Sequence, residues 1–338
     1  NNGSQGTKVF VDDREIRLTG EELLTYLRSL KSEDIKRIEV IPIAGAEYEA
    51  NSRGGVILIT LRQRINNGIQ GNITMGTGLS STLTNYLPSG SLNAHIGKWT
   101  VNAAASTTLA PKNESVMISG RQYTDAANRF SALSQFKTRS NYGTGRISTI
   151  FEIDTLNSLG AEIEYTGEVS KGSSSSQTEL TKQGFLINSI GNYRQNNNYN
   201  TVAATANYLH KLDNNGSILK LIVDYANKES TGKNNYYIVQ KISEQTKDST
   251  YRSNSDATYN IVSADASGKK VLRKGMSLNA GVRYTYTYMD DHSLYEDLTA
   301  GQQWIVKPSY GYALKYKEHI MGAYAAFSAE AGRWSLIA

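Results

Sequence analysis

Residues 276–288 alternate strictly between two kinds of side chain. The odd-numbered positions are polar or glycine, whereas the even-numbered positions are apolar or aromatic: Met276, Leu278, Ala280, Val282, Tyr284, Tyr286 and Tyr288. A period of two predicts a β-strand with one apolar face. Tyrosines, which favour the boundary between oil and water, gather at the end that leads to Asp290. A strand of about 9 to 11 residues with these properties is what a membrane-spanning β-barrel requires.

Composition supports a barrel over a soluble globular core. Only 39% of the 338 residues are hydrophobic, which is low for a buried core of that size, but a barrel needs apolar side chains only at alternate positions. No uncharged run approaches the roughly 18 apolar residues of a spanning helix. The absence of cysteine excludes thiolate metal sites and disulfides. The net charge of +5 is spread along the chain, which argues against nucleic-acid binding.

Further strands are expected along the chain, separated by connections of two lengths. The expected strands are 68–79, 91–97, 98–109, 145–153, 159–169, 201–212, 217–227, 257–271, 276–288 and 312–328, with the beginning of another at 333. Short turns such as Asp213-Asn214-Asn215-Gly216 alternate with long polar connections at 110–141, 170–199, 228–256 and 290–311. This alternation is typical of membrane barrels, and it predicts mobile external loops that contain residues 172–176 and 196–198.

Residues 7–64 differ in residue pattern from the expected strands that follow, and their pattern predicts a small α+β unit. Short strands are expected at 9–11, 38–41 and 55–61. Thr19 and Glu22 form a capping box that opens a helix with Leu23, Leu24, Leu27 and Leu30 on one face, and residues 32–37 are expected to add a helical turn.

Within this unit, residues 18–64 resemble the C-terminal half of the plug domain of TonB-dependent outer-membrane receptors, most closely the variety common in Bacteroidetes. The resemblance rests on Ile38-Glu39-Val40-Ile41, Ala46-Glu47-Tyr48 and Gly54-Gly55-Val56-Ile57, in the family's order and spacing. Its plug-motif positions are Glu39, Glu47, Tyr48, Arg53, Gly54 and Gly55. Many members continue the first segment with Arg-Gly-Pro, whereas this chain has Pro42-Ile43-Ala44. The plug arginine that pairs with barrel carboxylates in those members therefore has no counterpart at this position.

The resemblance implies a mainly β fold, an antiparallel transmembrane β-barrel preceded by a small α+β plug. Residues 1–64 would be the C-terminal part of the plug and residues 65–338 the N-terminal part of the barrel. Plugged transporters use about 22 strands, and ten strands are too few to hold a plug inside. Either the plug-like unit lies outside a small barrel or, as we favour, the chain is a piece of a longer polypeptide. The whole would bind a nutrient (a glycan, a siderophore or a cobalamin-like ligand) and import it into the periplasm, without catalysis or cofactor. Implied partners are the outer-membrane bilayer, a surface lipoprotein, and TonB through a Ton box upstream of this chain.

Candidate ligand contacts are the aromatic residues of the expected external loops: Tyr236, Tyr237, Tyr251 and Trp304. The simpler interpretation of such residues is an aromatic girdle at the membrane interface. The four histidines, His95, His210, His292 and His319, lack the spacing of metal ligands, so no metal site is expected.

Three alternatives stay open. In the first, the barrel is an anchor and its long loops form a surface for adhesion or assembly. Asp290, Asp291 and His292 would serve an outer-membrane hydrolase from the start of an external loop, although solvated charges are the simpler interpretation. A soluble all-β protein would have to explain three tyrosines on one face of a strand whose other face is polar.

Overall fold

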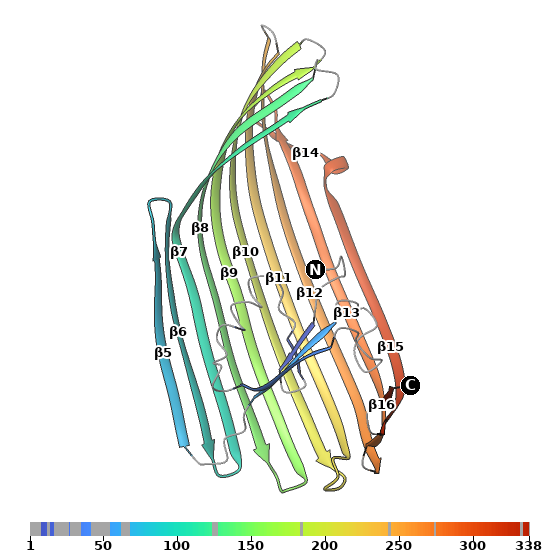
Figure 1. The fold of residues 1–338 in the computed structure, drawn as a ribbon. Coiled ribbons are helices and arrows are strands. Elements are labelled where there is room, and N and C mark those ends of the chain that lie inside the picture. The colour runs from blue at the N-terminus through green and yellow to red at the C-terminus, as the bar shows by residue number, and fades with distance from the viewer. Residues whose placement is uncertain are drawn as a thin grey trace.

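The computed structural model consists almost entirely of β-strands (Figure 1). It describes residues 8–11, 14–16, 27, 35–41, 55–61, 68–123, 128–182, 185–242, 245–273, 275–331 and 334–337. Among these residues, no helix combines the length and the apolar character needed to cross a membrane.

A large antiparallel sheet follows the chain from β5 at one edge to β16 at the other, and the short β14 pairs with β13. Strands β5 to β13 and β15 make ten, and β14 and β16 bring the sheet to twelve. The ten strands expected from the sequence are therefore confirmed. The bounds are β5 Gly68–Leu79, β6 Leu83–Ile96, β7 Trp99–Gln122, β8 Arg129–Glu152, β9 Asn157–Lys182, β10 Phe185–Lys211, β11 Ile218–Ile242, β12 Gln245–Arg273, β13 Met276–Leu298, β14 Trp304–Val306, β15 Tyr312–Ala331 and β16 Trp334–Ile337.

The sheet is curved and open (Figure 1). In the described part of the chain, its edge strands β5 and β16 do not pair with each other. A closed barrel of about 22 strands therefore stays a prediction.

The strands are much longer than expected, and this makes the prediction of long loops wrong. Strand β9 has 26 residues and β12 has 29. At roughly 3.3 Å per residue, β9 is about 85 Å long, whereas a bilayer's hydrocarbon core is about 30 Å thick. The described residues of 110–141, 170–199 and 228–256 lie mostly in paired strands, and residues 290–298 belong to β13. Residues 172–176 and 196–198 are paired as well, so they are not mobile loops.

Strict alternation of short and long connections is also wrong. Residues 80–82 join β5 to β6 at the upper ends of these two strands, and this connection is about as short as Gly97 and Lys98, which join β6 to β7 at the lower end of the sheet. The expected turn at 213–216 is confirmed, and Gly216 has a φ of 94°, which favours glycine. The asymmetry between the two ends comes from strand length: the hairpins from β7 onward extend far beyond β5 and β6 at the top of Figure 1.

A small mixed sheet precedes the large one, with order β2-β1-β4-β3 and bounds β1 Lys8–Val11, β2 Arg14–Ile16, β3 Ile35–Ile41 and β4 Val56–Leu61. Strand β1 is parallel to β4, and β3 is antiparallel to β4. Its buried side chains include Val9, Val56 and Ile59. The expected strands are confirmed, but residues 35–37 begin β3 rather than a helical turn. Of the expected helix, only Leu27 lies among the described residues, and its backbone is helical.

Candidate functional site: an apolar band and a tyrosine ladder

The lower half of the large sheet exposes apolar side chains and covers polar ones. On β11, Leu219 is 45% exposed and Val223 is 53% exposed, whereas Thr166 on β9 and Ser263 on β12, which point to the other face, are each 1% exposed. This arrangement is the reverse of a soluble protein. We call the exposed apolar side chains the apolar band: Leu159, Ile163 and Tyr165 on β9, Leu219, Leu221, Val223 and Tyr225 on β11, and Leu278 and Val282 on β13. The face that carries them is the band face, and the opposite face is the inner face.

Aromatic residues mark both borders of the apolar band. Near the upper border, the Tyr165 hydroxyl donates to Asn200 Oδ1 at 3.1 Å, and Tyr225 donates to Asn260 Oδ1 at 3.1 Å. On β9 the apolar band continues beyond Tyr165 to Val169, which is 46% exposed. At the lower end, the Trp99 and Phe151 rings lie 4.5 Å apart. Aromatic rings with an apolar body and a polar tip are typical of the two membrane interfaces. The girdle interpretation of the aromatic residues therefore fits the border tyrosines.

The inner face at the level of the band is polar and internally bonded. Arg146 Nη1 lies 3.3 Å from Glu162 Oε2, with both side chains mostly covered. Asp224 accepts hydrogen bonds from Thr205 Oγ1 at 2.8 Å and from Ser263 Oγ at 3.1 Å. Charged side chains on this face are characteristic of the lumen of a large barrel.

Above the apolar band, five tyrosines stack in a row across the inner face. The ring centroids of Tyr193 and Tyr236 lie 4.7 Å apart, and those of Tyr236 and Tyr251 lie 4.4 Å apart in a stacked arrangement. Tyr295 continues the row at 5.1 Å from Tyr251, and Tyr310 lies 5.2 Å beyond it. The five rings come from β10, β11, β12, β13 and the 3₁₀ turn η2 (Pro308–Tyr310). We call this row the tyrosine ladder. Each such ring pair contributes about 0.5–1.5 kcal/mol beyond area burial.

Three of the ladder phenols, those of Tyr193, Tyr251 and Tyr295, have raised pKa values and stay neutral at physiological pH. Burial, followed by the neighbouring Tyr236, raises the pKa of Tyr193 to about 12. Burial, followed by Asp297, raises the pKa of Tyr295 to about 12, and burial also raises the pKa of Tyr251. The Tyr193 hydroxyl lies within hydrogen-bond distance of Gln195 Oε1 (2.9 Å) and Asn234 Oδ1 (2.8 Å). The ladder therefore combines ring edges, neutral hydroxyl donors and amide side chains.

The structure brings together two of the four aromatic residues proposed as ligand contacts. Tyr236 and Tyr251 are adjacent in the ladder. Tyr237, the next residue along β11, points to the band face and is 44% exposed. Trp304 on β14 lies against Arg252, whose guanidinium carbon is 4.2 Å from the ring centroid and whose side chain also pairs with Glu296. The ligand contacts predicted from the sequence do not include Tyr193, Tyr295 and Tyr310.

Strand geometry separates the residues of the hydrolase hypothesis. Residues 290–292 lie within β13 and not at the start of a loop, so their side chains alternate between the two faces. On the band face, Asp290 is 3.2 Å from Lys315 Nζ, and His292 Nε2 is 3.4 Å from Asp256 Oδ2. Asp291 accepts a hydrogen bond from Tyr312 at 3.2 Å on the inner face. Within the described ranges, no group of three His, Asp or Glu side chains is placed to hold a metal ion.

Two of the six plug-motif positions lie among the described residues. Glu39 is on β3, with its carboxylate 2.9 Å from Arg37 Nη1. Gly55 precedes β4, is covered, and has a φ of 79°. Such a φ favours glycine at this position. Glu47, Tyr48, Arg53 and Gly54 lie outside the described residues.

Comparison with known families gives a match in the C-terminal part of the chain. Residues 210–338 match the sequence model of the outer membrane protein beta-barrel family. This segment contains β11 to β16 and most of the tyrosine ladder. The match supports an outer-membrane location for this part of the chain. No curated protein sequence matches the chain.

Solved structures with similar folds include three siderophore receptors. The siderophore receptor PiuA from Acinetobacter baumannii has 9% identity and a TM-score of 0.37, with 96% of this chain and 55% of PiuA covered. The ferric yersiniabactin uptake receptor FyuA from Yersinia pestis has 12% identity and a TM-score of 0.31, with 96% and 52% covered. The ferric enterobactin receptor PfeA from Pseudomonas aeruginosa, as its R480A mutant, has 10% identity and a TM-score of 0.31, with 95% and 64% covered. The chain thus spans about half the length of the first two.

Proposed function

We propose that this chain is part of a TonB-dependent outer-membrane receptor that binds a nutrient at its external hairpins and imports it into the periplasm. The observation that carries the proposal is the reversed burial of the large sheet: exposed apolar side chains on one face, covered polar ones on the other, and aromatic residues at both borders. Only a surrounding apolar phase makes that arrangement favourable. The family match over residues 210–338 supports the same location.

The domain assignment belongs to this proposal. Residues 1–64 would be the C-terminal part of a plug, and residues 65–338 the first part of a barrel. The motif resemblance around Glu39 and Gly55, together with the strand β3 that carries Glu39 and the strand β4 that begins after Gly55, supports it. TonB, engaged through an upstream Ton box, would supply the energy for import. A Bacteroidetes origin and a surface lipoprotein that captures the ligand follow from the resemblance alone.

The tyrosine ladder is the proposed ligand-binding surface. Its neighbours on the inner face include Gln195, Asn234 and Ser253, which offer amides and hydroxyls without formal charge. The carboxylate of Asp297, opposite Tyr251, is paired with Lys307 at 3.7 Å. Uncharged amides and hydroxyls satisfy the hydroxyls of a sugar by hydrogen bonding, whereas an anionic ligand would favour cations. Among the nutrient classes considered, the surface therefore fits a glycan best.

Two neighbouring tyrosines provide a matched test. The full-length protein in lipid nanodiscs would be titrated by calorimetry with neutral oligosaccharides and with ferric siderophores. We expect Tyr236→Ala to weaken oligosaccharide binding about tenfold or more, because a buried aromatic anchor is worth roughly 2 kcal/mol. Tyr237→Ala, one residue away on the opposite face, should change the affinity less than about twofold. Equal effects of the two substitutions would reject the ladder as the binding surface.

Adhesion or assembly is the second candidate, and one observation favours it. Above the apolar band, the band face of the long hairpins exposes Ile118 (82%), Ile190 (49%) and Leu133 (39%). Exposed apolar residues on neighbouring strands are typical of a protein contact surface. An Ile118→Ser/Ile190→Ser variant that abolishes cell aggregation while leaving ligand uptake intact would favour this function.

A further inference from the structure

On the band face of β9, a cation follows directly after the last exposed apolar residue. On β9, Val169 is the last apolar residue of the band face and is 46% exposed. It shares a register line with Asn141 on β8 and Leu109 on β7. The next residue on this face of β9 is Lys171, which lies directly opposite Arg139 on β8. On this face of β9, the side chains therefore change from apolar to cationic between two consecutive positions.

The cations form a patch that crosses four strands. The register line of Arg139 and Lys171 continues through Asn196 on β10 to Lys233 on β11. The neighbouring line adds Lys137 on β8 and Arg194 on β10. We call the group the basic patch: Lys137, Arg139, Lys171, Arg194 and Lys233. All five side chains are exposed.

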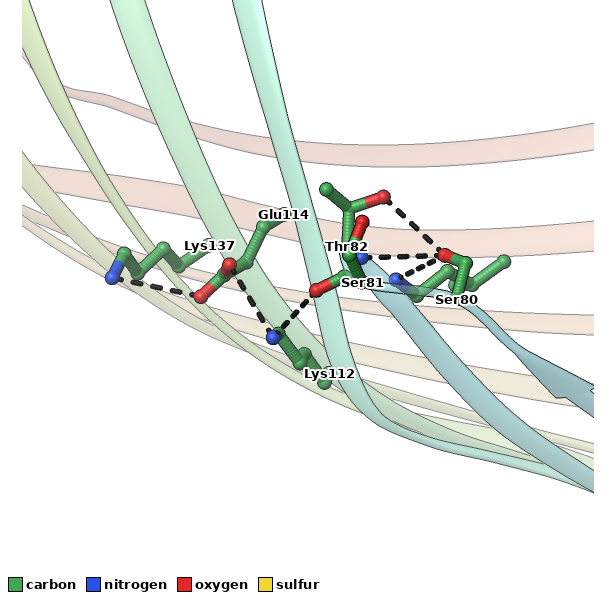
Figure 2. Close-up of polar contacts among 7 residues, drawn as sticks. Ser80, Ser81, Thr82, Lys112, Glu114 and Lys137 are labelled. Carbon is green, nitrogen blue, oxygen red and sulfur yellow. Dashed lines mark hydrogen bonds and ion pairs between the residues drawn. The ribbon is translucent and has the colours of Figure 1, made fainter.

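The basic patch has few counter-charges within the protein. Figure 2 shows Lys137 and Lys112 converging on Glu114, at 3.5 Å and 3.6 Å, so one carboxylate serves two ammonium groups. Lys112 also donates to the Ser81 carbonyl at 2.7 Å. In the described part of the chain, the other four members of the patch form no ion pair. Like charges placed directly opposite on neighbouring strands are destabilising, as Arg139 and Lys171 are, unless anions from outside compensate them.

The height of Lys171, and of Arg139 directly opposite it, fits the lipid headgroups. Lys171 is two residues beyond Val169, about 7 Å along the strand. Each headgroup layer extends about 5–8 Å beyond the hydrocarbon core. A guanidinium or ammonium at this level meets phosphate oxygens, and arginine binds them through two parallel hydrogen bonds.

We propose that Arg139 and Lys171 of the basic patch bind the phosphate groups of the lipid leaflet that surrounds the upper border of the apolar band. The inference rests on the proposed membrane embedding and adds a lipid-recognition site to it. The bound headgroups neutralise the repulsion within the patch and hold the long hairpins upright at the membrane surface.

The test is lipid selectivity at the protein surface, measured by electron paramagnetic resonance with spin-labelled phosphatidic acid and spin-labelled phosphatidylcholine. The full-length protein would be reconstituted in phosphatidylcholine bilayers. We expect the wild type to immobilise phosphatidic acid preferentially. Each cation removed should lower that preference by up to about fivefold at low salt, because a basic residue near the membrane surface is worth about 1 kcal/mol. The double variant Arg139→Ser/Lys171→Ser should therefore lose most of it.

Lys241→Ser is the matched control, because Lys241 is an exposed cation on the same face of β11, near the far end of the hairpin. It should keep the wild-type selectivity. Selectivity that is unchanged in the double variant would overturn the basic patch and leave the membrane embedding intact. A wild type that immobilises neither lipid would overturn both. In pure phosphatidylcholine, the double variant should be at least as resistant to unfolding as the wild type, which confirms that it folds.

Discussion

The lower and upper halves of β11 have different patterns of apolar and polar side chains, although they belong to one continuous strand. In the lower half, Leu219, Leu221 and Val223 alternate with Lys220 and Asp224, and the apolar set is the exposed one. In the upper half, both faces are largely polar, yet the pairing with β10 and β12 continues without a shift in register. Hydrophobic alternation therefore reports which part of a strand faces lipid, and it does not report where the strand ends.

The two halves are also stabilised by different forces. In the lower half, each polar backbone group must be paired, because the surrounding apolar phase offers no other partner. In the upper half, water competes for the same groups, and side-chain contacts decide whether the hairpins persist. The tyrosine ladder supplies such contacts across five elements, and Arg252, Glu296 and Trp304 supply them on the opposite face.

One pair of substitutions on β11 tests this difference with the largest expected effect. Val223→Arg places a charge in the apolar band, and it should destabilise the protein in lipid vesicles by about 2–4 kcal/mol. Thr231→Arg lies on the same strand and the same face, above the band, and should change stability by less than about 0.5 kcal/mol. Urea unfolding in phosphatidylcholine vesicles measures both. Equal effects would mean that no lipid boundary lies between the two positions.

The tyrosine ladder gives the next largest effect, and its removal should affect the upper half alone. Tyr251→Ala removes two ring contacts and a half-buried side chain, which costs about 1–3 kcal/mol locally. Amide hydrogen exchange should accelerate near residues 236–251 and stay unchanged at Val223 and Ser263. Tyr237→Ala is the control on the opposite face. Acceleration along the whole of β11 would contradict the separation into two halves.

Much of the lower half could be predicted from the sequence because its signal is local. The even-numbered residues of 276–288 identify the apolar face of β13, and the turn at 213–216 fixes the pairing of β10 with β11. Extending that pairing upward from Lys211 and Ile218 places Tyr193 opposite Tyr236, so this contact was accessible from the sequence. The polar composition of 228–256 suggested a loop instead, because polar side chains on both faces indicate solvent and not the absence of a strand.

The contact between Tyr236 and Tyr251 could not be predicted in the same way. It depends on the pairing of Ile242 with Gln245. The two residues between them in the sequence, Ser243 and Glu244, include none of the glycine, proline or asparagine that marks a hairpin turn. A shift of one residue there would turn Tyr251 to the opposite face. The place of Tyr310 in the ladder is even harder to predict from the sequence, because this residue reaches the ladder from the turn η2 and not from a paired strand.

A titration of Tyr193, in the upper half, tests how much the neighbouring Tyr236 contributes to its raised pKa. Burial and the neighbouring phenol raise the pKa of Tyr193 to about 12. The folded state therefore favours the protonated phenol, and the associated stability is present below pH 10 and is lost as the pH rises through about 12. Tyr236→Phe keeps a ring in place but removes the neighbouring hydroxyl, so the pKa of Tyr193 should move down toward 10. Phenolate absorbance near 295 nm, with Tyr193→Phe as the reference, measures the shift. No movement would leave burial as the whole cause.

The smallest effect is expected at Arg252, on the band face of the upper half. Its guanidinium donates to Glu296 through Nη2 at 3.1 Å as well as through Nε, and it lies 4.2 Å from the Trp304 ring centroid. Because the side chain is partly exposed and water screens the pair, Arg252→Gln should cost less than about 1 kcal/mol of overall stability. The substitution should nevertheless move the Trp304 emission to longer wavelength, since the ring loses the group that covers it. Trp304→Phe identifies that contribution against Trp99 and Trp334. A loss of several kcal/mol would show instead that the upper hairpins depend on this ion pair more than on the tyrosine ladder.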